Sequence, residues 1–174
     1  MAGVLRVNHQ AYYTIAMRII GIDPGTGILG FGVIETGPKG PQLVDAGVIR
    51  TLSTSDDAFR LATIYDELTD VITASKPKIM AVEKLFFAQN VTTAMTVSQA
   101  RGVVLLCGFQ AGLEIFEYTP LQIKQALTGY GRADKNQIQE MVRILLKLKI
   151  APKPDDCADA LAAAITHSMT AHYS

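Results

Sequence analysis

The run Arg18-Ile19-Ile20-Gly21-Ile22-Asp23 predicts a buried β-strand that ends in a carboxylate. The residues after it, Pro24-Gly25-Thr26-Gly27, supply the proline and glycines of a tight turn. Two further strands are predicted at 28–35 and 42–51, separated by the turn sequence Gly37-Pro38-Lys39-Gly40-Pro41. Because short connections join strands that run in opposite directions, these three strands are predicted to form an antiparallel meander.

The rest of the chain alternates helical and strand patterns. A helix is predicted at 56–75 and a buried strand at 78–83, which a right-handed crossover would place parallel to the first strand. The order predicts an α/β fold with a mixed five-stranded sheet, antiparallel over its first three strands and then parallel, with helices on both faces. Residues 17–174 are predicted to form this single domain. The remaining predicted elements are a helix at 91–112, a strand at 114–118, and helices at 120–127, 134–148 and 155–169.

Carboxylates stand at the ends of these predicted elements. Asp23 and Glu83 close the first and fourth strands, and Asp156 and Asp159 share a face at the start of the last helix. In sheets of this kind, sites form at the carboxyl ends of parallel strands where the strand order reverses. A buried carboxylate is costly unless it is paired or binds a metal. The four acids are therefore predicted to form one pocket, whose oxygen ligands suit Mg²⁺ or Mn²⁺.

Each acid also has a plainer interpretation. Asp23 alone could stabilise the following turn through local hydrogen bonds, and either helix acid alone could be an N-terminal cap. Strand alternation points Lys84 to the face opposite Glu83, which argues against a simple ion pair. The metal hypothesis depends on all four acids acting together.

A glycine pattern after the first strand matches a nucleotide-binding motif. Gly25, Gly27 and Gly30 have the spacing of the dinucleotide-binding fingerprint. That fingerprint requires a helix next, whose N-terminus holds the pyrophosphate. Here Phe31-Gly32-Val33-Ile34-Glu35 continues as a strand, and turn residues begin at Gly37. Nucleotide binding through this motif is therefore rejected.

Charge is unevenly distributed along the chain. The net charge is zero, but residues 118–153 carry seven Lys or Arg and two acids, a local balance of 7 − 2 = +5. A solvated helix face and a nucleic-acid surface explain this excess equally well. Lys124, Lys135 and Arg132, which lies in the glycine-rich loop 128–132, are the candidates for phosphate contacts.

The sequence indicates a functional role less strongly for Phe86, Phe87 and His167. Phe86 and Phe87 follow the fourth strand in a predicted loop. An exposed aromatic there could stack on an unpaired base, although folding back onto the core is the commoner arrangement. His167 has no second histidine at ligand spacing, so it is predicted to be structural or exposed.

The composition favours a cytoplasmic protein. Cys107 and Cys157 lie in apolar helical sequence and form no CxxC motif, so buried reduced thiols are predicted. No apolar run approaches the roughly 20 residues that a membrane span needs. Residues 1–16 do not join the pattern, and they are predicted to be a disordered extension or the result of a start codon assigned too early.

Four motifs, in order and spacing, resemble those of the RuvC family of Holliday-junction resolvases. The resemblance extends from Met17 to about His167 and covers nearly the whole chain. The motifs are Gly21-Ile22-Asp23-Pro24-Gly25, Val82-Glu83-Lys84-Leu85-Phe86-Phe87-Ala88-Gln89-Asn90, Gln99-Ala100-Arg101-Gly102 and Asp156-Cys157-Ala158-Asp159-Ala160-Leu161-Ala162.

The resemblance implies a ribonuclease-H-like fold and a homodimeric endonuclease. Such an enzyme would resolve four-way DNA junctions in recombination and repair by nicking two opposed strands symmetrically, leaving 5′-phosphate and 3′-hydroxyl ends. It would use Mg²⁺, two ions per active site, with Mn²⁺ as a substitute. It would work beside the RuvA–RuvB branch-migration complex. By position, the catalytic and metal-binding acids would be Asp23, Glu83, Asp156 and Asp159, the DNA-contacting residues Lys124, Lys135 and Phe86, and the dimer-interface residues Gln99 and Arg101.

Three other functions remain alternatives. Actin-like ATPases and sugar kinases share the turn after the first strand, but they clasp a nucleotide between two such domains and this chain holds one. A junction-binding module without activity would bind DNA and not cut it. A related ribonuclease-H-like nuclease would prefer structured RNA to a DNA junction.

Overall fold

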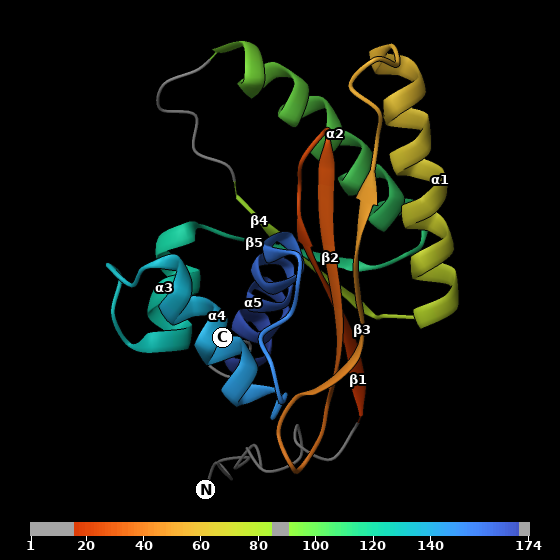
Figure 1. The fold of residues 1–174 in the computed structure, drawn as a ribbon. Helices are drawn as coiled ribbons and strands as arrows, with labels where there is room; N and C mark the ends of the chain where they lie inside the picture. Colours follow the sequence, from red (N-terminus) through yellow and green to blue (C-terminus); the bar gives the residue numbers. More distant parts are fainter. Residues whose placement is uncertain (1–15, 85–90, 171–174) are drawn as a thin grey trace, which may run out of the picture.

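One five-stranded sheet organises the molecule, in the order β3-β2-β1-β4-β5 (Figure 1). The computed structural model describes residues 16–84 and 91–170, so the predictions for residues 1–15 and for Phe86 lie outside the described residues. The strands are β1 (Met17–Asp23), β2 (Ile28–Thr36), β3 (Gln42–Arg50), β4 (Ile79–Glu83) and β5 (Glu114–Tyr118). The helices are α1 (Asp57–Ser75), α2 (Val91–Gln110), α3 (Pro120–Thr128), α4 (Lys135–Leu145) and α5 (Asp155–Thr170).

The strand directions confirm the predicted topology. β1, β2 and β3 pair antiparallel, whereas β4 pairs parallel with β1 and β5 parallel with β4. The largest difference in a boundary is in α4, which ends at Leu145 and not near residue 148, while α2 ends at Gln110 and not at residue 112. Lys147 adopts a left-handed conformation, with φ of 54°, which a continuing helix does not allow.

Helices cover both faces of the sheet, as predicted (Figure 1). On one face, apolar residues of α1 and α2 pack against alternate residues of the central strands. On the other face, α3, α4 and α5 pack against the residues in between. Each face therefore has its own apolar core, and β1 and β4 are buried between the two. In the described ranges, no helix has the length and apolarity to cross a membrane.

The last helix lies unusually close to the sheet because glycines face it. A Cβ added at Gly21 would lie 1.9 Å from the carbonyl oxygen of Ala160, and one at Gly30 would lie 2.1 Å from that of Asp156. Only glycine leaves room for backbone against backbone at this distance. The alanine-rich side of α5 therefore fits against β1 and β2, and this contact fixes where the acids of its first turns lie.

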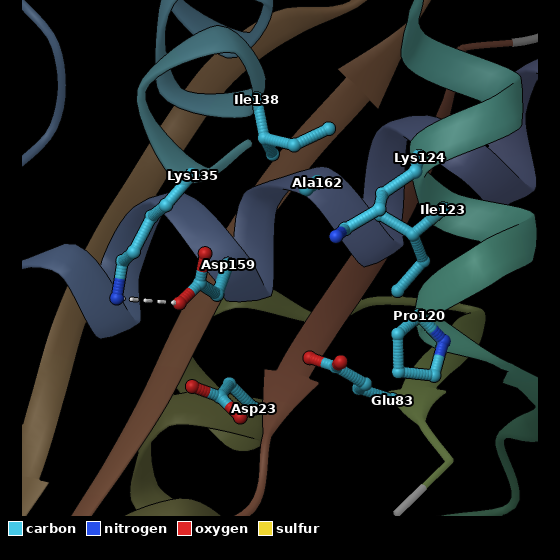
Figure 2. A pocket seen from close by; sticks show the side chains of 9 residues that line it. All are labelled: Asp23, Glu83, Pro120, Ile123, Lys124, Lys135, Ile138, Asp159 and Ala162. Carbon is cyan, nitrogen blue, oxygen red and sulfur yellow. Dashed lines mark ion pairs between the residues drawn. The ribbon is translucent and has the colours of Figure 1, made fainter. Parts of the chain in front are cut away.

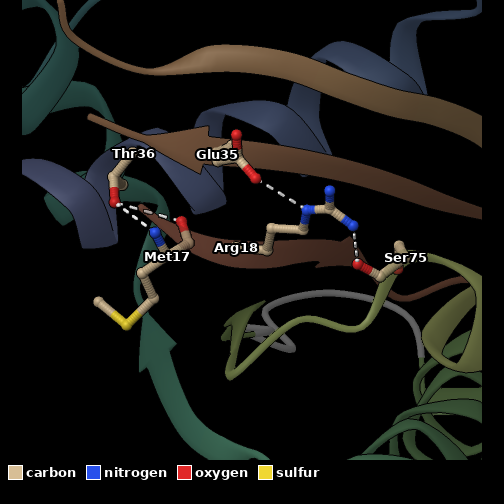
Figure 3. Close-up of polar contacts among 5 residues, drawn as sticks. All are labelled: Met17, Arg18, Glu35, Thr36 and Ser75. Atoms are coloured by element: carbon tan, nitrogen blue, oxygen red, sulfur yellow. Dashed lines mark hydrogen bonds and ion pairs between the residues drawn. The ribbon is translucent and has the colours of Figure 1, made fainter. Parts of the chain in front are cut away.

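The beginning of β1 is tied to two neighbours (Figure 3). Arg18 Nε donates to Glu35 Oε1 on β2 at 3.0 Å, and its Nη1 donates to the carbonyl oxygen of Ser75 at the end of α1 at 2.7 Å. The Met17 backbone N–H donates to Thr36 Oγ1 at 3.3 Å. These contacts are partly exposed and individually small, about 1 kcal/mol or less. They fix the strand whose other end carries Asp23.

Candidate active site

Three of the four predicted acids line one pocket (Figure 2). Asp23 and Glu83 end neighbouring parallel strands, in which Ile22 is paired with Val82. Asp159 reaches the same space from α5. The rest of the lining comes from α3, α4 and α5: Pro120, Ile123, Lys124, Lys135, Ile138 and Ala162. The prediction that the ends of the first and fourth strands meet is therefore confirmed.

Asp156 takes a different position from the other three acids, because its side chain does not line this pocket. Its backbone lies against Gly30, the residue that pairs with Asp23 across β1 and β2. Its charge still reaches the site, since it helps to raise the pKa of Asp23 and that of Asp159. Its role as a metal ligand stays a prediction.

Burial and mutual repulsion disfavour negative charge in the pocket. Burial, followed by the charges of Glu83, Asp159 and Asp156, raises the pKa of Asp23 to about 7. Burial, followed by Asp159, raises the pKa of Glu83 to about 7, against the opposing effect of Lys124 and Lys135. Burial also raises the pKa of Asp159, while Lys135 lowers it. The raised pKa values show that the pocket has too little positive charge to balance its carboxylates. A bound divalent cation would supply that charge.

Two lysines bring positive charge to the rim. Lys135 Nζ lies 3.3 Å from Asp159 Oδ2 and 3.4 Å from Asp155 Oδ2. The Lys124 ammonium points into the pocket from α3 (Figure 2). The helices that carry these lysines, α3 and α4, begin at capping boxes formed by Thr119 and Asp134. Both lysines line the pocket beside the acids, and their predicted contacts with phosphate stay predictions.

The donor set fits a hard divalent cation, although it does not form a finished coordination shell. Its ligands are all carboxylate oxygens, the type that Mg²⁺ and Mn²⁺ prefer. Among the described residues, no three His, Cys, Asp or Glu side chains converge closely enough to hold an ion as they stand. Asp159, which contacts Lys135, would exchange this partner if it bound an ion.

The other predicted site residues lie away from the pocket. Arg132 is exposed in the loop between α3 and α4 and does not line the pocket. Gln99 is exposed on α2, and Arg101 forms an ion pair with Glu117 on β5. Their proposed contacts with DNA or with a second protomer stay predictions.

The position of His167 decides between the two predicted alternatives for this residue. The His167 side chain is buried, and its Nδ1 lies 2.7 Å from the hydroxyl of Tyr118, the last residue of β5. It is therefore structural, the first of the two predicted alternatives.

Ile123 and Ile138 form the apolar wall of the pocket and were not predicted as site residues. Nothing in their local sequence distinguishes them from other core residues, since both are buried on amphipathic helices.

The raised pKa of Glu83 predicts a pH-dependent stability in metal-free protein. Its folded-state pKa of about 7 exceeds the ordinary value of 4.5, so the folded state binds more protons between these values. Stability is therefore favoured at low pH and is lost as the pH rises through 7. Glu83→Gln is expected to be more stable than wild type by roughly 1–3 kcal/mol at pH 8, and to lose this advantage at pH 5.

Urea unfolding in EDTA at the two pH values measures this difference. Glu67→Gln, an exposed acid on α1, is the matched control and is expected to change stability by less than about 0.5 kcal/mol at either pH. A Glu83→Gln protein that is destabilised equally at pH 5 and pH 8 would show that the carboxylate is not under electrostatic strain.

A mixed sheet of this order, with acids at the ends of two adjacent parallel strands and on the facing helix, defines a ribonuclease-H-like nuclease domain. The family model described as crossover junction endodeoxyribonuclease RuvC matches residues 19–167. The chain belongs to this RuvC family of metal-dependent nucleases.

Individual relatives of the family align with this chain over nearly their full lengths. The RuvC of Roseiflexus sp. (strain RS-1) is 54% identical over 156 residues, which are 90% of this chain and 93% of the relative. That of Heliobacterium modesticaldum is 53% identical over 88% of this chain and 96% of the relative. The structure of T. thermophilus RuvC in complex with a Holliday junction substrate has a TM-score of 0.85 and 39% identity, covering 90% of this chain and 95% of that one. Yeast mitochondrial Ydc2, at 12% identity and a TM-score of 0.67, shares the fold.

Proposed function

We propose that this chain resolves four-way DNA junctions in recombination and repair by symmetric, metal-dependent nicking of two opposed strands. The observation that carries the proposal is the convergence of Asp23, Glu83 and Asp159 on one pocket that two lysines flank. The likeness to T. thermophilus RuvC, whose structure holds a Holliday junction substrate, supports the choice of DNA. The proposed products are nicks with 5′-phosphate and 3′-hydroxyl ends.

Asp23, Glu83, Asp156 and Asp159 are the proposed ligands of two Mg²⁺ ions, for which Mn²⁺ would substitute. When bound, such ions supply Lewis acidity and a more acidic water. The chain's own contribution is to hold the oxygen ligands together in a half-buried pocket, where their raised pKa values make the binding of a cation depend on pH. Deprotonation of Asp23 and Glu83, both with a pKa of about 7, favours binding above neutral pH.

The lysines are proposed to place the scissile phosphate. Lys124 points into the acidic pocket. Lys135 contacts Asp159 and would be able to bind the phosphate once Asp159 serves as a metal ligand. Without these two lysines, the charged side chains that line the pocket in the described part of the chain would all be carboxylates. Arg132 and Phe86 are proposed further DNA contacts, on the loop after α3 and after β4 respectively.

Lys124→Ala is expected to slow cutting by about 10–100-fold, because it removes a charge aimed at the reacting phosphate. Junction affinity should fall by less than about tenfold, since one phosphate contact among many is lost. Single-turnover cleavage and gel-shift binding of a labelled junction measure the two effects. The matched control is Lys78→Ala, an exposed lysine just before β4, at the end opposite Glu83. Unchanged cutting by Lys124→Ala would remove Lys124 from the site.

Symmetric cutting implies two equivalent sites, as a two-fold dimer provides. The proposed interface is α2, which includes Gln99 and Arg101 and exposes Met95, Leu106 and Phe109. An apolar helix with this much exposed surface fits a protein contact. We further propose that residues 17–174 form a single nuclease domain. The protein is proposed to be cytoplasmic and to work with the RuvA–RuvB complex.

Strand-resolved mapping tests the proposed reaction. Each of the four strands of a synthetic junction is labelled in turn, and the nicks formed with Mg²⁺ are located. The proposal predicts nicks at symmetric positions in two opposed strands, which a DNA ligase reseals. Cuts in adjacent strands, or ends that cannot be ligated, would contradict it.

A further inference from the structure

The turn that follows Asp23 is held from outside by Thr51, the residue after β3. The Thr51 hydroxyl donates to the carbonyl oxygen of Thr26 at 2.5 Å, and its backbone N–H donates to the carbonyl oxygen of Gly27 at 3.1 Å. One residue therefore fixes two successive carbonyl groups of a turn that is distant from it in the sequence. The shape of the turn depends on this contact as well as on its own proline and glycines.

Arg60, in the first turn of α1, completes the arrangement. Its Nε donates to Thr51 Oγ1 at 2.9 Å, and its Nη1 lies 3.6 Å from Asp57 Oδ1. Only 15% of the Arg60 side chain is exposed, so this donor is largely withdrawn from water. The Thr51 hydroxyl has one proton and gives it to Thr26, which leaves its lone pairs for Arg60. Accepting from a charged donor strengthens the hydroxyl's own donation, so the two bonds reinforce each other.

Few soft torsions separate this Thr51–Arg60 clamp from the Asp23 carboxylate. Pro24 fixes one backbone torsion of the turn. Gly25 is so crowded that a Cβ there would lie 2.1 Å from the carbonyl oxygen of Ile28. On its other side, Asp23 pairs with Gly30 of β2. Only Pro24 and Gly25 separate Asp23 from Thr26, whose carbonyl group the clamp holds, so a shift of that group can be passed to the backbone of Asp23.

From these contacts we infer that Thr51 and Arg60 are positioning residues for Asp23. The inference rests on the proposed function, which makes the Asp23 carboxylate a metal ligand. Neither Thr51 nor Arg60 lines the pocket, so both act through the turn 24–27. Displacing a reacting or ligating group by about 1 Å typically costs on the order of 10²-fold in rate. The clamp should therefore affect cutting much more than DNA binding.

Thr51→Val tests the clamp, because it keeps the shape and the backbone N–H and removes only the hydroxyl. At saturating Mg²⁺ it is expected to cut a bound junction about 10–100-fold more slowly, with the junction Kd within about twofold of wild type. In protein without DNA or metal, the amide at position 51 should exchange its hydrogen at least about tenfold faster, after correction for residue type. Thr51→Ser should restore the cutting rate and the slow exchange of this amide. Arg60→Gln should slow cutting and speed the exchange.

Thr63→Val is the matched control, since its hydroxyl donates to the carbonyl oxygen of Phe59 within α1 and touches no part of the turn. It is expected to cut like wild type. Thr51→Val cutting within twofold of wild type would overturn the inference, as would equal losses in Thr51→Val and Thr63→Val. If wild type itself fails to cut, the proposed function fails, while the hydrogen-exchange readout still decides whether the clamp holds the turn.

Discussion

Asp23→Asn is expected to slow junction cutting by at least about 1,000-fold and to leave junction affinity within about twofold. The asparagine fills the same space but loses the anionic oxygen at the centre of the proposed metal site, which is worth several kcal/mol in the transition state. Asp23 lies beside Glu83 and Asp159, so the remaining acids cannot take over its position. DNA binding depends chiefly on cations and on shape, which the substitution leaves in place.

Single-turnover cleavage with excess enzyme, beside gel-shift binding in EDTA, separates these two effects. Asp70→Asn, an exposed acid on α1 at the opposite face of the sheet, is the matched control and should cut like wild type. If Asp23→Asn also loses junction binding, Asp23 supports the fold and is not a catalytic ligand. If it cuts normally, the acidic pocket is not the active site.

Gly21→Ala is expected to destabilise the protein by about 3 kcal/mol, which corresponds to a fall of roughly 6–12 °C in Tm. The added Cβ would meet the carbonyl oxygen of Ala160 at 1.9 Å and the amide nitrogen of Ala164 at 2.8 Å. Both are backbone atoms of α5, so no side-chain rotation relieves the clash. The helix must move away from the sheet and take Asp159 with it, and cutting should be lost even in the folded fraction.

Thermal unfolding measures the loss, with Gly37→Ala as the matched control. A Cβ at Gly37 would meet nothing within 4 Å, so the same change there should alter stability by less than about 0.5 kcal/mol. Equal stability of Gly21→Ala and Gly37→Ala would show that the close approach of α5 to β1 is not required.

The strand-end acids could be predicted because two local patterns coincide at each of them. Asp23 and Glu83 each close an apolar run, and the intervening helix requires parallel pairing, so their meeting follows from topology. The position of the Asp156 side chain outside the pocket lining could not be predicted in this way. It depends on how α5 is rotated over Gly30 and Gly21, a packing contact with no local signal.

The glycines after β1 show how one pattern can have two meanings. Their spacing matches a nucleotide-binding motif, but the strand β2 begins at Ile28, as predicted, where that motif requires a helix. Gly30 instead gives the backbone of Asp156 room to approach β2. The Thr51–Arg60 clamp was equally hidden, because the turn that it holds lies about 25 residues before Thr51 in the sequence.

Cleavage of a labelled four-way DNA junction with Mg²⁺ or Mn²⁺, beside a linear duplex of the same sequence, tests the central claim most directly. The account predicts paired nicks in the junction, no comparable cutting of the duplex, and loss of the nicks in Asp23→Asn. Binding of the junction without cutting in either metal would contradict it and leave a junction-binding module. Equal cutting of junction and duplex would contradict the proposed selectivity for junctions.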